Sequence, residues 1–512
     1  FNPPEPTVID KVMMLRDAAR EDKIKGVVVR ITTIEYDFAK AQEFRQAILR
    51  YKKKTGKPVF AYLELEGGGN LEYYLASACD KIYLSPASSI LLNGLASTSV
   101  YLGGLWPKIY IDMQVDKIKE YKTFGDMIAN KEMSEAEREM KNAILDSLFD
   151  QFLSDIASGR MVDKTKVKGW VDAAWTDSQS FLDAGAVDGI VYLDDVVKKI
   201  GGDLVTEEKF NSLISARKVK LPGKRVAVIF AAGNIIAGDA PTGPFSNNSV
   251  IASNPMVKKL EKALEDKSIE AVIIRVDSGG GSALASDLIW DATQRLKAKK
   301  PVVVSMSDVA ASGGYYIACG ASSIVAQPAT ITGSIGIVTA HPSVGRLLSK
   351  IGINTTTLGR GEFADFGTML RPMNEAELKK THNSLVSLYN LFIKRVGQGR
   401  KLSNERVNEI GRGRVWTGVQ AKEIGLVDQL GGFEEAIDEV KRLLNLGADA
   451  EISLVYGHER VTLWKLLTGR VEESVVERSL TRTELELVRE LRLQGMWEPG
   501  QPLALMDSFQ VR

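Results

Sequence analysis

The sequence contains few of the residues that hold metals and form disulfides. Among its 512 residues there are two cysteines and three histidines. A disulfide framework needs more cysteines, and a structural zinc site needs about four Cys or His ligands. We therefore predict no metal site and no cofactor. Cys79 and Cys319 each lie in a run of small and aromatic residues, and we interpret both as free thiols that fill buried apolar space.

The chain also lacks an excess of one charge and a long hydrophobic run. Lys and Arg number 66 and Asp and Glu 65, so the net charge is +1. Nucleic-acid binding needs clustered Lys and Arg, and we predict no such partner. No apolar run reaches the roughly 20 residues that span a bilayer, and Asn234 interrupts the best candidate, residues 226–238. Because the chain begins at Phe1 and not at Met, we expect that an N-terminal signal or anchor has been removed.

What the sequence does contain is an internal repeat. Residues 24–31 read Ile-Lys-Gly-Val-Val-Val-Arg-Ile, and residues 269–276 read Ile-Glu-Ala-Val-Ile-Ile-Arg-Val, 245 positions later. Five shorter matches recur at separations of 240 to 243, among them Lys-Pro-Val, Tyr-Tyr and Trp-Thr. A nearly constant separation over so many matches indicates two copies of one domain.

The repeat defines the predicted domain organisation. We place the first copy at residues 1–205, a charged linker at 206–221 and the second copy at 222–445. Residues 446–512 show helical stretches such as 483–493, and we interpret them as an accessory tail without chemistry of its own.

Each copy has an α/β pattern. In the second copy, short apolar runs suited to buried strands alternate with stretches of helical spacing, which implies parallel pairing with right-handed crossovers. The expected strands are residues 269–276, 301–306 and 323–327, and the expected helices are residues 283–297, 312–319 and 373–396.

Two glycine-rich turns of the second copy are candidates for function. Residues 277–282 read Asp-Ser-Gly-Gly-Gly-Ser, and residues 310–315 read Ala-Ala-Ser-Gly-Gly-Tyr. Both are also compatible with plain tight turns, whereas a phosphate-binding loop is disfavoured because no Gly-Lys-Ser/Thr follows. In the first copy Asn70 stands opposite Ser312, and residues 32–36, opposite the first turn, have no glycine. Restriction to one copy favours function over folding, with Ser312 as a nucleophile.

A nucleophilic serine needs a base. The three histidines, His341, His382 and His458, come without an obvious carboxylate partner, so a Ser-His-Asp triad is weakly supported. The alternative base is a lysine whose pKa is lowered from about 10.4 by burial, so that a neutral amine accepts the serine proton.

The residues that bear on this question resemble one family. Residues 311–315, Ala-Ser-Gly-Gly-Tyr, and residues 332–336, Thr-Gly-Ser-Ile-Gly, are similar to the two signatures of signal peptide peptidase A. Residues 277–281 resemble its Asn-Ser-Pro-Gly-Gly turn, and residues 121–123, Tyr-Lys-Thr, resemble its Tyr-Lys-Ser segment. The resemblance implies two tandem crotonase-like or Clp-protease-like domains, with parallel sheets and flanking helices, in which the first supplies a lysine and the second a serine.

The resemblance also implies the site and its setting. Ser312 would be the nucleophile and Lys122 the general base, with Ser334 orienting the amine and Gly280, Gly281 and Gly313 forming the oxyanion hole. The expected protein is a homotetramer, held in the bacterial inner membrane by an N-terminal anchor, that faces the periplasm and degrades cleaved signal peptides. Gly279 replaces the family's proline, Lys119 a glycine and Thr123 a serine, and Lys117 and Lys119 stay open as alternative bases.

Two rival functions share some of these features. A crotonase-type enzyme acting on acyl-CoA would use the same fold and oxyanion glycines, but it does not require Ser312 or a lysine from the other repeat. A catalytically inactive, membrane-associated scaffold would need neither residue. Labelling of Ser312 by a serine-directed covalent inhibitor distinguishes these cases from a protease.

Overall fold

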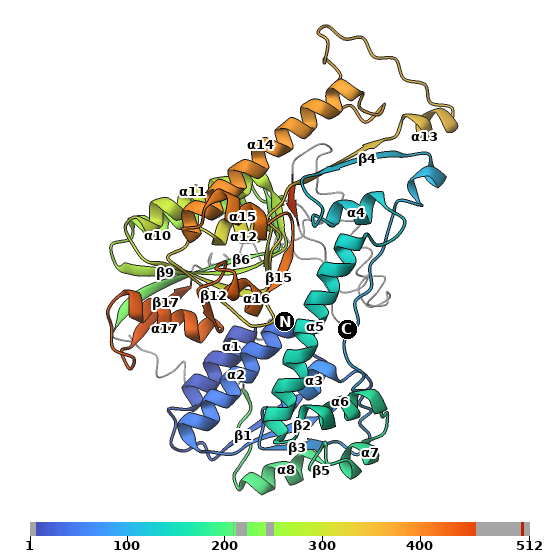
Figure 1. Ribbon diagram of the computed structural model, residues 1–512. Helices are drawn as coiled ribbons and strands as arrows, with labels where there is room; N and C mark the ends of the chain where they lie inside the picture. Colours follow the sequence, from blue (N-terminus) through green and yellow to red (C-terminus); the bar gives the residue numbers. More distant parts are fainter. Residues whose placement is uncertain (1–6, 208, 211–222, 242–249, 457–502, 506–512) are drawn as a thin grey trace, which may run out of the picture.

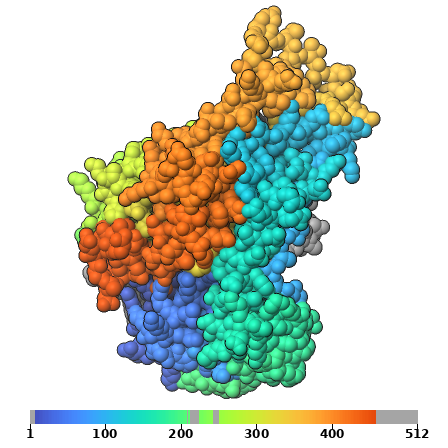
Figure 2. Space-filling model, viewed as in Figure 1, coloured from blue at the N-terminus to red at the C-terminus, as the bar shows by residue number. Residues whose placement is uncertain are grey.

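A computed structural model describes residues 7–207, 209–210, 223–241, 250–456 and 503–505 of the chain. The two repeats form two neighbouring α/β bodies, with the first at the bottom of Figure 1 and the second above it. Figure 2 shows residues of the first repeat, in cyan and teal, lying along the orange surface of the second. The two copies are therefore packed against each other, as a shared site requires.

The first repeat contains a four-stranded parallel sheet in the order β1-β2-β3-β5. Its strands are β1 (Val27–Ile31), β2 (Val59–Leu63), β3 (Lys81–Leu84) and β5 (Gly189–Ile190). A further strand, β4 (Asp112–Lys117), leaves this body and joins another sheet. The helices of this half are α1 (Val8–Ala18), α2 (Phe38–Thr55), α3 (Asn70–Ala76), η1 (Trp106–Ile109), α4 (Phe124–Ala129), α5 (Glu135–Arg160), α6 (Lys164–Ala173), α7 (Ser178–Asp183) and α8 (Leu193–Ile200).

The second repeat is built on a larger, mainly parallel sheet in which β11 lies between β9 and β13. Its strands are β6 (Lys224–Ala232), β9 (Ile269–Ser278), β11 (Val302–Ala311), β12 (Ser323–Ala326), β13 (Ile331–Gly333), β15 (Val415–Thr417), β16 (Gln429–Leu430) and β17 (Ile452–Tyr456). Its helices are α10 (Ser253–Glu265), α11 (Ala283–Lys297), α12 (Gly313–Ala318), α13 (Gly345–Lys350), α14 (Glu375–Arg400), α15 (Asn404–Ile410), α16 (Gly418–Glu423) and α17 (Phe433–Leu443).

The strands of the second repeat are continuous apolar runs because helices cover both faces of its sheet. Ile273 and Val303 share a buried cluster with Phe433 and Ile437 of α17. Val304, on the other face, belongs to the cluster that contains buried residues of α10, α11, α12 and α14. The predicted α/β class with parallel sheets is confirmed, and the helix expected at residues 283–297 is α11 with the same bounds.

The two long helices show the repeat most directly. Helix α5 and helix α14 both have 26 residues, and their first residues, Glu135 and Glu375, are 240 positions apart. Ser134 caps α5 and Asn374 caps α14, each side chain accepting a backbone N–H three residues on. The sequence therefore encodes the same start signal twice.

A third sheet joins the halves, in the order β4-β14-β18-β10-β7-β8. Strand β4 of the first repeat pairs antiparallel with β14 of the second, from Lys117 opposite Val338 to Asp112 opposite Ser343. This pairing carries the chain that follows β4 into the second repeat. The remaining strands are β7 (Asn234–Ile236), β8 (Val250–Ala252), β10 (Gly280–Ser282), β14 (Val338–Ser343) and β18 (Leu503–Leu505).

The structure differs from the predicted boundary at residue 445. Strand β17 pairs in parallel with β6 and extends the main sheet, so the second body continues to Tyr456. The tail assigned to residues 446–512 thus begins with a core strand, and residues 503–505 form a strand of the third sheet. The helix expected at residues 483–493, and most of the linker at 206–221, lie outside the described residues.

Candidate active site

Ser312 lies at a strained turn between a strand and a helix. Strand β11 ends at Ala311 and α12 begins at Gly313, and Ser312 between them has φ 54° and ψ −116°. This backbone conformation costs a non-glycine residue on the order of 1–3 kcal/mol, and such strain is typical of functional residues. The Ser312 N–H donates to the carbonyl of Gly333 at 2.8 Å, which holds the turn in place.

The glycine at position 314 allows this turn to form. A Cβ on Gly314 would lie 2.3 Å from the carbonyl oxygen of Ser278. Only a glycine lets α12 approach the turn after β9 so closely. The two glycine-rich turns singled out in the sequence are therefore in contact.

Lys122 reaches Ser312 from the first repeat. Its Nζ lies 2.7 Å from Ser312 Oγ, 3.0 Å from Ser334 Oγ and 3.1 Å from the carbonyl oxygen of Ser334. Lys122 is 1% exposed and Ser312 is fully buried. Desolvation disfavours a charged ammonium at such a place, which is the condition under which a lysine can act as a base.

The path of the lysine side chain depends on two further glycines. A Cβ on Gly413 would lie 2.5 Å from the backbone nitrogen of Lys122, and Gly413 has φ +82°. A Cβ on Gly336 would lie 3.1 Å from Lys122 Cδ. Gly336 was part of a recognised motif, whereas Gly413 was missed; the Gly-Arg-Gly-Arg sequence around it was the available signal.

Three of the alternative bases, Lys117, His341 and His382, have other partners. Lys117 Nζ pairs with Asp126 at 2.5 Å, and Lys119 is exposed. His341 Nε2 lies 3.0 Å from the carbonyl oxygen of Thr368. His382 Nδ1 lies 3.0 Å from a carboxylate oxygen of Asp116, and His458 is outside the described residues. Among the predicted bases that the structure describes, Lys122 lies within hydrogen-bonding distance of Ser312.

The glycines predicted to form the oxyanion hole lie in the two glycine-rich turns that contact each other. Gly280 and Gly281 have φ of 112° and 151°, and Gly313 is the first residue of α12. The Gly280 N–H donates to Ser278 Oγ at 3.1 Å, so this donor is engaged within the turn. A Cβ on Gly281 would lie 2.0 Å from the carbonyl oxygen of Ile235 in β7, which explains the need for glycine there.

A cluster of charged groups that the sequence analysis missed ties both turns to the first repeat. Lys40 of α2 pairs with Asp277 at 2.6 Å and with Asp308 at 3.0 Å. Asp277 is the first residue of the glycine-rich turn at 277–282, and Asp308 lies on β11, four residues before Ser312. Asp308 also accepts the backbone N–H groups of Asp37 and Lys40. The start of α2 is thus fixed to both turns.

The charged groups in this cluster shift one another's pKa values. Burial raises the pKa of Asp308 to about 7, because desolvation of its carboxylate, together with repulsion from Asp277 and Asp37, outweighs the attraction of Lys40. Burial alone would lower the pKa of Lys40, but Asp308 and Asp277 raise it above its usual value. The two carboxylates share one ammonium here, which favours retention of a proton on Asp308.

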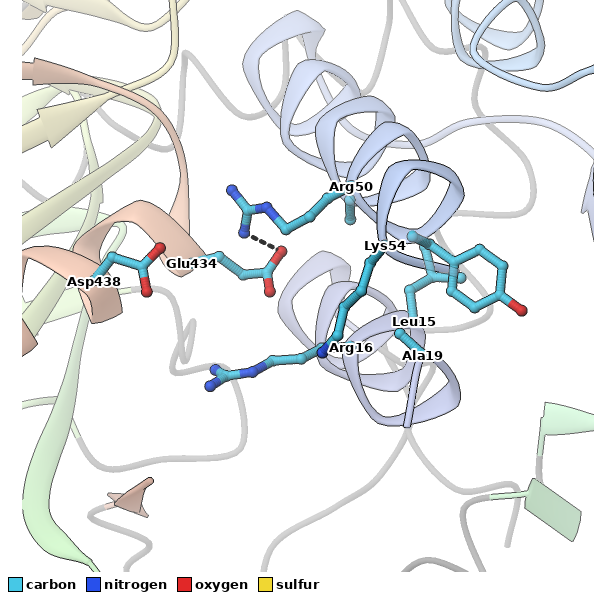
Figure 3. A pocket seen from close by; sticks show the side chains of 9 residues that line it. Leu15, Arg16, Ala19, Arg50, Lys54, Glu434 and Asp438 are labelled. Atoms are coloured by element: carbon cyan, nitrogen blue, oxygen red, sulfur yellow. Dashed lines mark ion pairs between the residues drawn. The ribbon is translucent and has the colours of Figure 1, made fainter. Parts of the chain in front are cut away.

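A separate polar pocket lies between the repeats. It is lined by α1, α2 and α17, and Arg50 forms an ion pair with Glu434 across it (Figure 3). Burial raises the pKa of Glu434, with Arg50 opposing the shift. None of the predicted site residues lines this pocket. We assign it to the packing of the two halves.

Comparison with known proteins identifies the family. The model of Peptidase family S49 matches residues 51–204 and again residues 294–447. The two matches begin 243 positions apart (294 minus 51), which agrees with the repeat in the sequence, and together they cover more than half of the chain. The chain belongs to peptidase family S49. It is accordingly a serine protease built from two S49 repeats, and the predicted family and enzyme class are confirmed.

Relatives of this S49 peptidase align over most of its length. Serine protease SPPA, chloroplastic, of Arabidopsis thaliana is 34% identical over 490 residues, covering 93% of this chain and 71% of that protein. Protease 4 of Haemophilus influenzae is 30% identical over 470 residues, covering 87% and 74%. The putative signal peptide peptidase SppA of Enterococcus faecium is 33% identical over 245 residues, covering 47% and 68%.

Proposed function

We propose that this S49 peptidase hydrolyses peptide bonds with a Ser312–Lys122 dyad and that its substrates are cleaved signal peptides. The observation that carries the dyad is the 2.7 Å separation of Lys122 Nζ from Ser312 Oγ in a buried site. The similarity to a relative named as a putative signal peptide peptidase supports the substrate class.

The reaction proceeds through an acyl-enzyme. The neutral Lys122 amine accepts the hydroxyl proton of Ser312 as its Oγ attacks the scissile carbonyl, and the resulting ammonium returns that proton to the leaving amine. Water, activated by the same amine, then hydrolyses the ester and regenerates Ser312. Ser334 Oγ orients the lysine during both steps, because it lies 3.0 Å from Nζ.

The developing oxyanion needs N–H donors near Ser312. We assign this role to Gly313, which begins α12, and to the turn formed by Gly280 and Gly281. If Gly280 contributes, its N–H must leave Ser278 Oγ. One donor of this kind typically supplies about 3 kcal/mol of transition-state stabilisation.

The cellular setting belongs to the same proposal. Cleaved signal peptides are apolar and stay with the membrane, so we propose that the protein acts at the bacterial inner membrane and faces the periplasm. The proposed assembly is a homotetramer. Within the residues that the structure describes, no helix is both long and apolar enough to cross a membrane. The proposed attachment is an N-terminal anchor, and native mass spectrometry of the protein in detergent tests the tetramer.

Peptide hydrolysis by matched variants tests the proposed chemistry. Ser312→Ala and Lys122→Ala should each reduce cleavage of an apolar signal-peptide sequence by at least about a thousandfold, as expected for loss of a nucleophile or its base. The control variants are Ser343→Ala, which removes a buried hydroxyl without a hydrogen-bond partner, and Lys119→Ala, which removes an exposed amine. Full activity of Lys122→Ala, or turnover of acyl-CoA thioesters without peptide cleavage, would contradict the proposal.

A further inference from the structure

A short segment between α15 and β15, residues 412–414, contacts the chain on both sides of the proposed base. The N–H of Tyr121, the residue before the base, donates to the carbonyl oxygen of Arg412 at 3.2 Å. The N–H of Ser334, the serine that orients the base, donates to the carbonyl oxygen of Arg414 at 2.7 Å. The separation of the lysine from its orienting serine therefore depends on this segment.

Ser334 needs this support because its backbone is strained. It has φ 51°, a conformation that costs a non-glycine residue free energy and persists only where neighbouring contacts enforce it. The pairing of β13 with β15, with Gly333 opposite Val415, brings the segment beside Ser334. Both the Oγ and the carbonyl oxygen of Ser334 lie within 3.1 Å of Lys122 Nζ. A shift of the segment would therefore move both contacts between Ser334 and the amine.

The side chain of Arg414 fixes the segment to Tyr121. Its guanidinium carbon lies 4.9 Å from the ring centre of Tyr121 and 4.7 Å from that of Trp416. Its Nη1 donates to one carboxylate oxygen of Glu139 in α5 at 2.7 Å, and the Tyr121 hydroxyl donates to the other at 2.8 Å. A planar guanidinium can stack on aromatic rings and bind a carboxylate at the same time. Arg414 therefore joins helix α5 of the first repeat to the chain that carries the base.

The exposed fractions of the two charged side chains show which contact matters more. Glu139 is 58% exposed, and an ion pair to such a group contributes little to stability. Arg414 is 19% exposed, and a cation stacked on aromatic rings interacts more strongly where water is largely excluded. We therefore expect the stacking to hold the segment in place and the carboxylate to orient the guanidinium.

We propose that Arg414 is a positioning residue that keeps the Lys122 amine and Ser334 at hydrogen-bonding distance. This inference rests on the proposed Ser312–Lys122 dyad and adds a residue that supports it. Arg414 acts on the base through the ring of Tyr121, and it acts on Ser334 through its own carbonyl oxygen. One residue thus controls the positions of both groups, although they come from different repeats.

Peptide hydrolysis by Arg414→Ala tests the proposal. We expect kcat to fall at least about tenfold, since catalysis is sensitive to displacements near 1 Å. KM should stay unchanged, because Arg414 acts on the base and not on the bound peptide. The control Arg406→Ala removes an exposed ion pair with Glu409 on α15 and should match the unmodified protein. Unchanged kcat in Arg414→Ala would overturn the proposal.

A double-mutant cycle tests whether Arg414 acts through Tyr121. Tyr121→Phe keeps the ring and should retain most of the activity, whereas Tyr121→Ala should lower kcat as Arg414→Ala does. The two alanine changes remove the same contact, so the double variant should be little slower than either single variant. Losses that multiply in the double variant would overturn the action of Arg414 through Tyr121.

A third measurement does not depend on peptidase activity. In the Ser312→Ala background, hydrogen exchange of the Tyr121 and Ser334 amides should speed up when Arg414→Ala is added, because both amides donate to the segment that Arg414 fixes. Unchanged exchange would overturn the role of the Arg414 side chain. Faster exchange, combined with an absence of peptide cleavage by the unmodified protein, would overturn the proposed function and leave the structural role of Arg414 intact.

Discussion

Glu43 in the first repeat and Arg275 in the second form a buried, bidentate ion pair between the halves of the molecule. Arg275 Nη2 lies 2.5 Å from Glu43 Oε2, Nη1 lies 3.2 Å from Oε1, and both side chains are at most 5% exposed. Glu43 also accepts the backbone N–H of Phe433 at the start of α17. A dyad built from both repeats needs a fixed interface, and Arg275 lies on β9, the strand that leads into the oxyanion turn.

Removal of one partner of this pair should destabilise the protein strongly. Glu43→Ala leaves the Arg275 guanidinium buried without its carboxylate, which typically costs about 3–5 kcal/mol. Chemical denaturation of the variant measures this loss, with Arg30→Ala as a control, because Arg30 occupies the equivalent position of the first repeat and forms an exposed pair with Glu64. Equal losses in the two variants would contradict a special role for the buried pair.

The Asp308 cluster should make stability depend on pH. The folded state holds a proton on Asp308 up to about pH 7, whereas the unfolded carboxyl releases it near pH 4. Between these values the folded state binds more protons, so the free energy of unfolding falls as pH rises. A shift of this size amounts to a few kcal/mol.

Asp308→Asn tests that pH dependence. The amide cannot ionise, so the variant should lose less stability than the unmodified protein between about pH 4 and pH 7. Denaturation at several pH values measures the two curves. Parallel curves across this window would show that Asp308 does not hold the extra proton.

Gly413→Ala should displace the base without touching the nucleophile. The added Cβ would lie 2.5 Å from the backbone nitrogen of Lys122, and the backbone at this position has φ +82°. We expect kcat to fall at least about tenfold, since catalysis is sensitive to displacements near 1 Å. Gly169→Ala is the matched control, because its Cβ would meet open space on α6. Unchanged kcat in Gly413→Ala would contradict the close packing around Lys122.

Much of this architecture is visible in the sequence because it is local or repeated. The continuous apolar runs predict the buried strands, and the 240-residue separations predict two copies with matching helices such as α5 and α14. Ser312 was identifiable because its glycine-rich turn occurs in one copy alone.

The remaining features depend on contacts between distant residues. Gly413 contacts Lys122 across nearly 300 positions, and Lys40 meets Asp277 and Asp308 through the packing of the two repeats. The Gly-Arg-Gly-Arg sequence marks Gly413 as a turn residue but does not indicate its partner, and Lys40 has no local pattern that marks it. Strand β18 is three residues long and pairs with β10 and β14, which lie far away in the sequence. The sequence pattern of the tail predicted helical stretches and missed this strand.

The central claim is that the Lys122 amine activates the Ser312 hydroxyl. Its most direct test is the rate at which a serine-directed covalent inhibitor labels Ser312. Mass spectrometry measures this rate in the unmodified protein and in Lys122→Met across a range of pH. The account predicts labelling confined to Ser312, a rate that rises with pH as the amine loses its proton, and a drop of at least about a hundredfold in the variant. Equal rates in the two proteins at every pH would contradict it.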